Sequence, residues 1–181
     1  MHRFALTLAA SLAAMIGLSQ VRPAAAQAQG PDDPTIIAIF DAANTVDMET
    51  GALAAERAQT PSVREFGKML ARDHQVVRQQ GRDLAAKLKV TPTPPADRSA
   101  ADAHAKAMTS LRGKSGLAFD RAFLEHEVAF HAAVIDAVKT TLLPAIDNAE
   151  LRALVVKVAP AFEAHRQAAQ QLLDKLPATS Y

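Results

Sequence analysis

Apolar residues recur every three or four positions through three long stretches of the chain. This spacing places them on one face of an α-helix, where they can pack against other helices. The three sets are Val63, Phe66, Leu70, Val77, Leu84 and Leu88; Leu124, Val128, Ile135, Val138 and Leu142; and Leu151, Leu154, Val158, Phe162, Leu172 and Leu176. No segment shows the two-residue alternation of a strand, so the sequence predicts an all-α protein.

Prolines and capping residues divide the chain into five expected helices. Asp33-Pro34 and Thr60-Pro61 each resemble an N-cap followed by proline, and Asp147-Asn148 resembles a third cap. Pro144 is expected to end the fourth helix and Pro160 to kink the fifth. The expected helices span residues 34–59, 61–90, 97–112, 117–143 and 149–176.

The connections between these helices predict how they pack. The first two helices are joined so tightly that they must be antiparallel neighbours. Residues 91–95, Thr-Pro-Thr-Pro-Pro, cannot be helical and predict an extended spacer. We therefore expect a four-helix bundle made of two helical hairpins, joined by a Pro-rich crossover and a short extra helix.

Residues 1–26 have the features of a secretory signal peptide. A basic start at His2 and Arg3 precedes an apolar run of 15 residues from Phe4 to Leu18, and Ala24-Ala25-Ala26 supplies a cleavage site. The run is shorter than the ~20 residues that span a bilayer. We therefore expect an exported, periplasmic protein with no transmembrane segment after cleavage. The remaining chain divides into a lead-in at 27–33, a helical domain at 34–176 and a tail at 177–181.

Composition agrees with a helical fold and excludes several classes of function. The chain contains 40 alanines, which favour helix, and no cysteine, so it forms neither disulfides nor thiolate metal sites. The formal charge of +1 becomes −1 after loss of Arg3 and Arg22, because 18 basic residues then face 19 acidic ones. Without a basic excess, no nucleic-acid partner is predicted. Any metal must be held by histidine and carboxylate.

Each long helix carries an ionisable residue where its stripe should be apolar. His74, His131 and His165 interrupt the three apolar stripes. In the first helix, Glu49 takes the corresponding position between Val46 and Leu53. Glu127 lies four residues before His131 and therefore shares its helix face. At ~1.5 Å of rise per residue, these positions reach similar heights in the bundle. The sequence thus predicts that they meet in its middle.

Two interpretations follow, because burying such groups costs several kcal/mol unless they are paired or metal-bound. In the first, His74, His131, His165 and Glu49 or Glu127 bind one divalent zinc, iron, copper or nickel ion. Asp73, next to His74, would then be a further ligand, orient a ligating imidazole or simply be solvated. In the second, the same groups form a hydrogen-bond network in a metal-free structural or stress-response bundle, which acts by binding another protein or an envelope component.

The same residues carry a resemblance to a known family. The matching segments are 69–74 (Met-Leu-Ala-Arg-Asp-His), 119–123 (Phe-Asp-Arg-Ala-Phe) and 159–165 (Ala-Pro-Ala-Phe-Glu-Ala-His), together with Glu49 and His131. In these the chain resembles the bacterial exported family called domain of unknown function 4142. The resemblance implies a ferritin-like four-helix fold and export to the periplasm or outer-membrane region, and it brings no established activity.

The sequence departs from the di-iron pattern of ferritin-like bundles. That pattern places a Glu three residues before a His on two of the helices. Here Ala71 precedes His74 and Phe162 precedes His165 at that spacing, so a di-iron centre is not expected. Since a serine nucleophile elbow and a phosphate loop are also missing, we do not predict a hydrolase. Redox activity stays open if the bound metal is redox-active.

Overall fold

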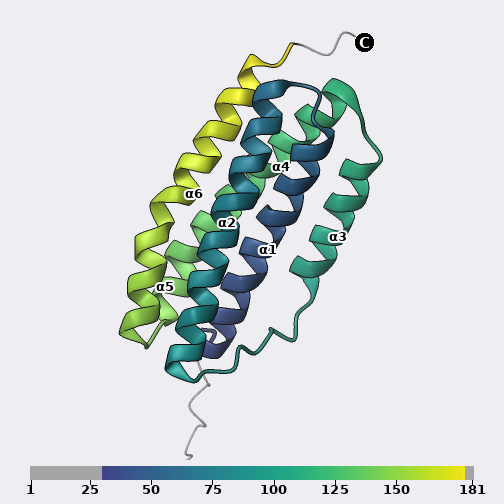
Figure 1. Ribbon diagram of the computed structural model, residues 1–181. Coiled ribbons are helices and arrows are strands. Elements are labelled where there is room, and N and C mark those ends of the chain that lie inside the picture. Colours follow the sequence, from purple (N-terminus) through teal and green to yellow (C-terminus); the bar gives the residue numbers. More distant parts are fainter. Residues whose placement is uncertain (1–29, 178–181) are drawn as a thin grey trace, which may run out of the picture.

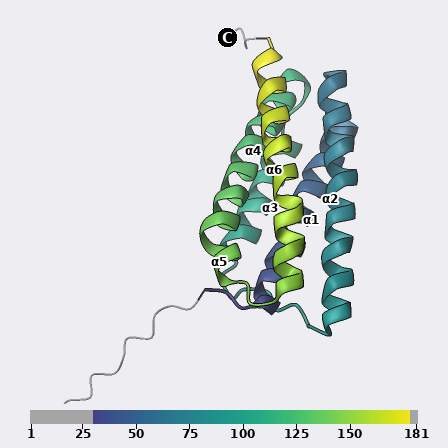
Figure 2. The ribbon, with the colours of Figure 1, turned by 90° about the vertical axis from the view of Figure 1, so that its left-hand side faces the viewer.

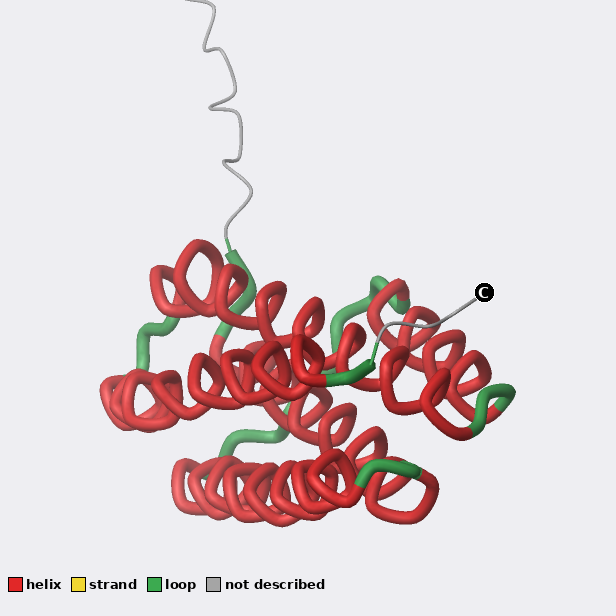
Figure 3. The backbone as a smooth tube through the Cα atoms, turned by 90° about the horizontal axis from the view of Figure 1, so that it is seen from above, coloured by secondary structure: helices red, strands yellow, loops and turns green. Residues whose placement is uncertain are grey.

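The computed structural model describes residues 30–177, which form helices joined by loops (Figures 1 and 3). The predicted signal peptide lies outside these residues. α3 (Ser99–Arg112) lies along the outside of a bundle of longer helices. The long helices are α1 (Asp33–Arg57), α2 (Pro61–Leu88), α4 (Gly116–Ala137) and α6 (Ala149–Lys175). The prediction of an all-α bundle is confirmed.

The bundle consists of two helical hairpins, as expected. α1 packs along α2, and α4 packs along α6 (Figure 2). The hairpins meet where α1 contacts α4 and α2 contacts α6, which closes a four-helix arrangement. The crossover after α2 starts at Lys89, whose φ of 54° turns the chain out of the helix, and Thr93 N–H then donates to the carbonyl of Pro34.

A carboxylate from each hairpin fixes the turn of the other. Asp120 in α4 is fully buried and accepts hydrogen bonds from the backbone N–H groups of Gln59 and Thr60, at 2.9 and 2.7 Å. At the opposite end, the Asp33 carboxylate accepts from the N–H groups of Asp147 and Asn148. These bonds satisfy backbone donors that would otherwise lack partners. They therefore set the relative height of the two hairpins.

The structure accommodates two prolines that were expected to disturb the second hairpin. The helical path ends at Ala145, one residue after Pro144, and before that it widens into a π-helical segment, η1 (Val138–Leu142), followed by α5 (Leu143–Ala145). The wider turn accommodates a residue that cannot donate a regular helical hydrogen bond. α6 runs without interruption through Pro160, which is exposed, so water can solvate the carbonyl it leaves unpaired.

Two apolar cores fill the bundle, one on each side of a polar layer at mid-height. The first core lies near the α5–α6 turn and is built around Ile36, Phe40 and Val155. The second lies near the α1–α2 turn and is built around Leu70, Phe119 and Phe123. The buried polar residues between the two cores therefore sit in surroundings that exclude water.

The segment Gly116–Ala145 is long and apolar enough to cross a membrane by length and composition, because it contains an 18-residue window with a mean hydropathy of 1.3. This differs from the expectation that no such segment follows the signal peptide. In the bundle the same segment forms α4, η1 and α5, and it presents the buried Glu127 and His131 to the interior.

α1 and α2 approach closely at a pair of facing glycines. A Cβ atom added at Gly51 would lie 2.7 Å from the Gly67 carbonyl oxygen and 2.9 Å from the Ala71 nitrogen. A Cβ added at Gly67 would likewise lie 2.7 Å from the Gly51 oxygen. Because these neighbours are backbone atoms, they cannot move aside without separating the helices.

We expect Gly51→Ala to lower the free energy of unfolding by about 2 kcal/mol, because the added methyl forces the two backbones apart. Urea unfolding of the metal-free protein measures the change. Gly113→Ala is the matched control, since its Cβ would meet only ordinary contacts at 3.5 and 3.6 Å. That variant should change stability by no more than about 0.5 kcal/mol. Equal losses in both variants would contradict the close approach.

Candidate metal centre

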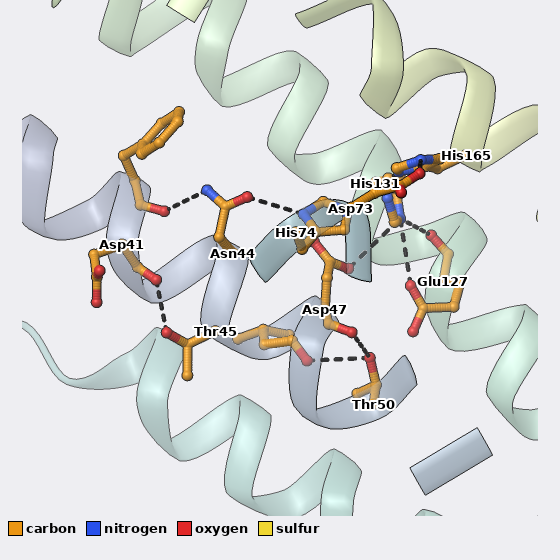
Figure 4. Close-up of polar contacts among 12 residues, drawn as sticks. Asp41, Asn44, Thr45, Asp47, Thr50, Asp73, His74, Glu127, His131 and His165 are labelled. Atoms are coloured by element: carbon orange, nitrogen blue, oxygen red, sulfur yellow. Dashed lines mark hydrogen bonds and ion pairs between the residues drawn. The ribbon is translucent and has the colours of Figure 1, made fainter. Parts of the chain in front are cut away.

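The polar layer brings ionisable side chains from all four long helices to one place (Figure 4). α1 contributes Asn44 and Asp47, α2 contributes His74, α4 contributes Glu127 and His131, and α6 contributes His165. All are buried, and the exposed fraction is 0% for Asp47, Glu127 and His131. A cluster of this kind requires compensating partners, because water does not reach it.

The three histidines converge as the sequence predicted. One ring nitrogen from each of His74, His131 and His165 lies within 4.8 Å of the other two. The closest pair is His74 Nε2 and His165 Nδ1, at 3.1 Å. A transition metal binds imidazole nitrogens at about 2.0–2.1 Å, so a small contraction would let one ion contact all three rings.

Hydrogen bonds on the outer side of two rings leave their inner nitrogens unprotonated. The Asn44 amide donates to the Phe40 carbonyl, so its oxygen faces His74 and accepts from His74 Nδ1–H at 2.9 Å. His131 Nδ1–H donates to the Glu127 backbone carbonyl, also at 2.9 Å. Both rings therefore keep the Nε2 lone pair, and that of His131 has no hydrogen-bond partner. This is how ligating histidines are oriented in metal sites.

Asp73 lies beside the third ring, as expected for a residue that orients a ligand. Its Oδ2 is 3.5 Å from His165 Nε2, and its other oxygen accepts from Arg72. The Asp73 side chain is 35% exposed, whereas that of His165 is 9% exposed. The layer therefore comes nearest to solvent at the seam between α2 and α6.

The surroundings keep the histidines neutral. Burial, followed by repulsion from His165 and His131, lowers the pKa of His74 to about 3. Burial also lowers the pKa of His131 to about 4, although the bond to the Glu127 carbonyl opposes this. The pKa of His165 is lowered by burial and partly restored by Asp73. Neutral imidazole is the form that binds metal, so the rings need not lose a positive charge on binding.

Two carboxylates next to the histidines are buried without hydrogen-bond partners. No other residue donates a hydrogen bond to the side-chain oxygens of Asp47 and Glu127 when both groups are ionised. The two carboxyl groups lie close enough to hydrogen-bond to each other when one of them is protonated. Burial raises the pKa of Glu127 to about 7. Burial and the nearby Glu127 raise the pKa of Asp47 well above its usual range. One oxygen of each, with one nitrogen of His131, forms a second group whose atoms lie within 4.8 Å of one another.

The structure corrects the prediction for Glu49. Its carboxylate lies outside the layer, 53% exposed, and pairs with His104 on α3 at 2.8 Å. The inward carboxylate of α1 is Asp47, two residues earlier, which the sequence analysis missed. The sequence contains a signal for Asp47, because Phe40, Asn44, Asp47 and Gly51 are spaced to share one helix face. This spacing is as regular as that of Val46, Glu49 and Leu53, so the two faces compete. The other four predicted ligands, His74, Glu127, His131 and His165, lie in the layer.

The sequence model of a family described as a domain of unknown function (DUF4142) matches residues 19–172. The chain belongs to this family. The match includes the three histidines and both buried carboxylates of the layer. No curated protein matches the sequence.

A solved structure titled "CopM in the Cu(II)-bound form" resembles this DUF4142 protein with a TM-score of 0.62. The similarity covers 81% of this chain and 100% of the CopM chain, at 15% sequence identity. At 15% sequence identity, the similarity shows that the two proteins share a fold.

Glu127→Gln should alter the pH dependence of stability in the metal-free protein. The folded state holds the Glu127 proton up to a pKa of about 7, whereas the ordinary pKa of a glutamate, as in the unfolded chain, is 4.5. The contribution of this group to wild-type stability therefore falls as the pH rises from 4.5 to 7. Between pH 4 and pH 8, the free energy of unfolding of the variant should therefore rise by about 3 kcal/mol relative to that of wild type.

Urea unfolding at both pH values, in the presence of a chelator, measures this gain. Glu125→Gln is the matched control, because Glu125 lies on the same helix and is exposed. We expect that variant to differ little from wild type at either pH. A gain for Glu127→Gln that is the same at pH 4 and pH 8 would show that its carboxylate is not held protonated by the fold.

Proposed function

We propose that this protein is an exported helical bundle that binds a transition metal ion through His74, His131 and His165. The observation that carries the proposal is the convergence of three neutral, buried imidazoles whose ring nitrogens lie within 4.8 Å of one another. Export rests on the signal peptide predicted at residues 1–26. Storage, sensing or protection against a redox-active metal are the roles that suit an ion enclosed in this way.

Binding requires only a small change in the hydrogen bonds of the layer. His74 Nε2 and His131 Nε2 already present lone pairs, because their Nδ1–H groups donate to Asn44 and to the Glu127 carbonyl. His165 Nδ1 currently donates to His74 Nε2. For His165 Nδ1 to bind an ion, the neutral ring would shift its single proton from Nδ1 to Nε2, which faces Asp73. The residues present therefore suit a three-histidine site.

Copper is the metal that we propose first. Three imidazoles suit zinc, copper, iron and nickel, and Cu(II) binds such donors most tightly in the series of divalent ions. The structural similarity to a protein titled as Cu(II)-bound supports the same choice. A metal-free bundle, stabilised by the same hydrogen bonds, is the competing explanation.

A saturating Cu(II) concentration, about 100 times the dissociation constant, should raise the thermal midpoint by roughly 5–10 °C. Electron paramagnetic resonance of the first equivalent should show coupling to imidazole nitrogens. His74→Gln should lose most of the shift, because it removes a central ligand. His104→Gln is the control, since His104 lies outside the layer and pairs with Glu49. Elemental analysis of untagged protein from the exported fraction should find at least about one equivalent of metal.

Equal, trace metal in wild type and His74→Gln, with a midpoint that does not respond to Cu(II) or to chelator, would favour the metal-free bundle. A midpoint shift lost equally in His104→Gln would place the ion elsewhere.

A further inference from the structure

The three-histidine site does not explain why the carboxylates of Asp47 and Glu127 are buried. Both are fully buried, and all four of their carboxylate oxygens lack hydrogen-bond partners. Both lie near Nδ1 of His131, and Asp47 Oδ2 also lies 3.4 Å from His74 Nδ1. His131 Nδ1 lies 3.4 Å from Glu127 Oε2 and 3.9 Å from Asp47 Oδ1.

Unpartnered buried carboxylates are rare in folded proteins, because each gives up its hydration without compensation. One resolution is that the pair shares protons and stays neutral. The other is a cation between the carboxylates, since buried charges are usually paired or bound to a metal. Among residues 30–177, no Lys or Arg forms an ion pair with either side chain.

We propose that Asp47, Glu127 and His131 hold a second divalent ion, so that the His131 ring bridges two metals. The inference rests on the proposed function, because the first ion occupies the Nε2 side of the same ring. In Figure 4, Glu127 lies beside His131, and Asp47 lies close to both His74 and His131. One ligand atom from each of the three residues already lies within 4.8 Å of the others.

The proton balance of this step follows from the hydrogen bonds. His131 Nδ1–H donates to the Glu127 carbonyl in the metal-free state. The second ion takes the place of this proton, which leaves to solvent together with any proton held by the carboxylates. A metal on Nε2 withdraws electron density from the ring and makes Nδ1–H more acidic. Binding is therefore sequential, with the histidine site filled first.

The donor set indicates the class of the second ion. Two carboxylates and one imidazole suit zinc, iron(II) or manganese(II), whereas three imidazoles suit copper, zinc or nickel. The pair of sites also differs from the di-iron pattern excluded by the sequence, because the shared ligand is an imidazole and not a carboxylate.

Counting zinc ions tests the proposal. The stripped, full-length exported protein is titrated with Zn²⁺, and bound zinc is measured after removal of free ions. Wild type should bind about two ions per chain. The isosteric double variant Asp47→Asn/Glu127→Gln should bind about one and keep the histidine site. The matched control is Glu49→Gln/Glu125→Gln, which alters two exposed carboxylates on the same two helices and should bind the same number as wild type.

Each outcome has a separate meaning. One ion in wild type and one in the double variant would overturn the second site and leave the proposed function standing. No ion in wild type would overturn both. A loss of the second ion in the control as well would overturn the assignment to Asp47 and Glu127. Far-ultraviolet circular dichroism of each variant establishes that it is folded.

A measurement on wild type alone keeps the proposal testable if the double variant does not fold. The first equivalent of Cu(II) should give a full paramagnetic resonance signal. Cu(II) binds nitrogen and oxygen donors most tightly of the divalent ions, so the second equivalent should enter the carboxylate site. It should reduce the total signal, because two Cu(II) ions joined by one imidazolate couple magnetically. A signal that simply doubles would contradict a bridge through His131.

Discussion

Burial of a polar layer in the middle of an apolar bundle is the constraint on which this structure depends. The cores above and below exclude water from His74, His131, Asp47 and Glu127, and this exclusion lowers the histidine pKa values and raises those of the carboxylates. Neutral imidazoles with fixed outer hydrogen bonds are metal ligands that need little rearrangement. The same exclusion of water leaves two carboxylates without partners. The features that suggest metal binding thus have one physical origin.

The rest of the fold keeps this layer in register. Asp120 and Asp33 each fix the turn of the opposite hairpin, so the hairpins cannot slide along one another without losing hydrogen bonds. Gly51 and Gly67 bring α1 and α2 close at the level next to the layer. Because each ligand comes from a different place in the sequence, the geometry of the cluster depends on these distant contacts.

The helices, their hairpin order and the three histidines could be predicted because they depend on local spacing and on proline and capping signals. The error at α1 has a physical reason. Its alanine-rich sequence gives two candidate inner faces, and the inward face is decided by the close approach to α2 at Gly51, which puts Asp47 inside and Glu49 against His104 on α3. The path through Pro144 was likewise decided by packing, because burial of Val138 and Leu142 favours a widened turn over an ended helix.

The sequence by itself therefore determined which residue types are available: no cysteine, and histidines placed where leucine is expected. It could do so because helical periodicity is a property of neighbouring residues. Only the tertiary structure decided that His74, His131 and His165 meet, that Asp47 joins Glu127 and that their oxygens lack partners. Those facts depend on the rotation and height of four helices relative to one another, which are set by contacts between residues far apart in the chain.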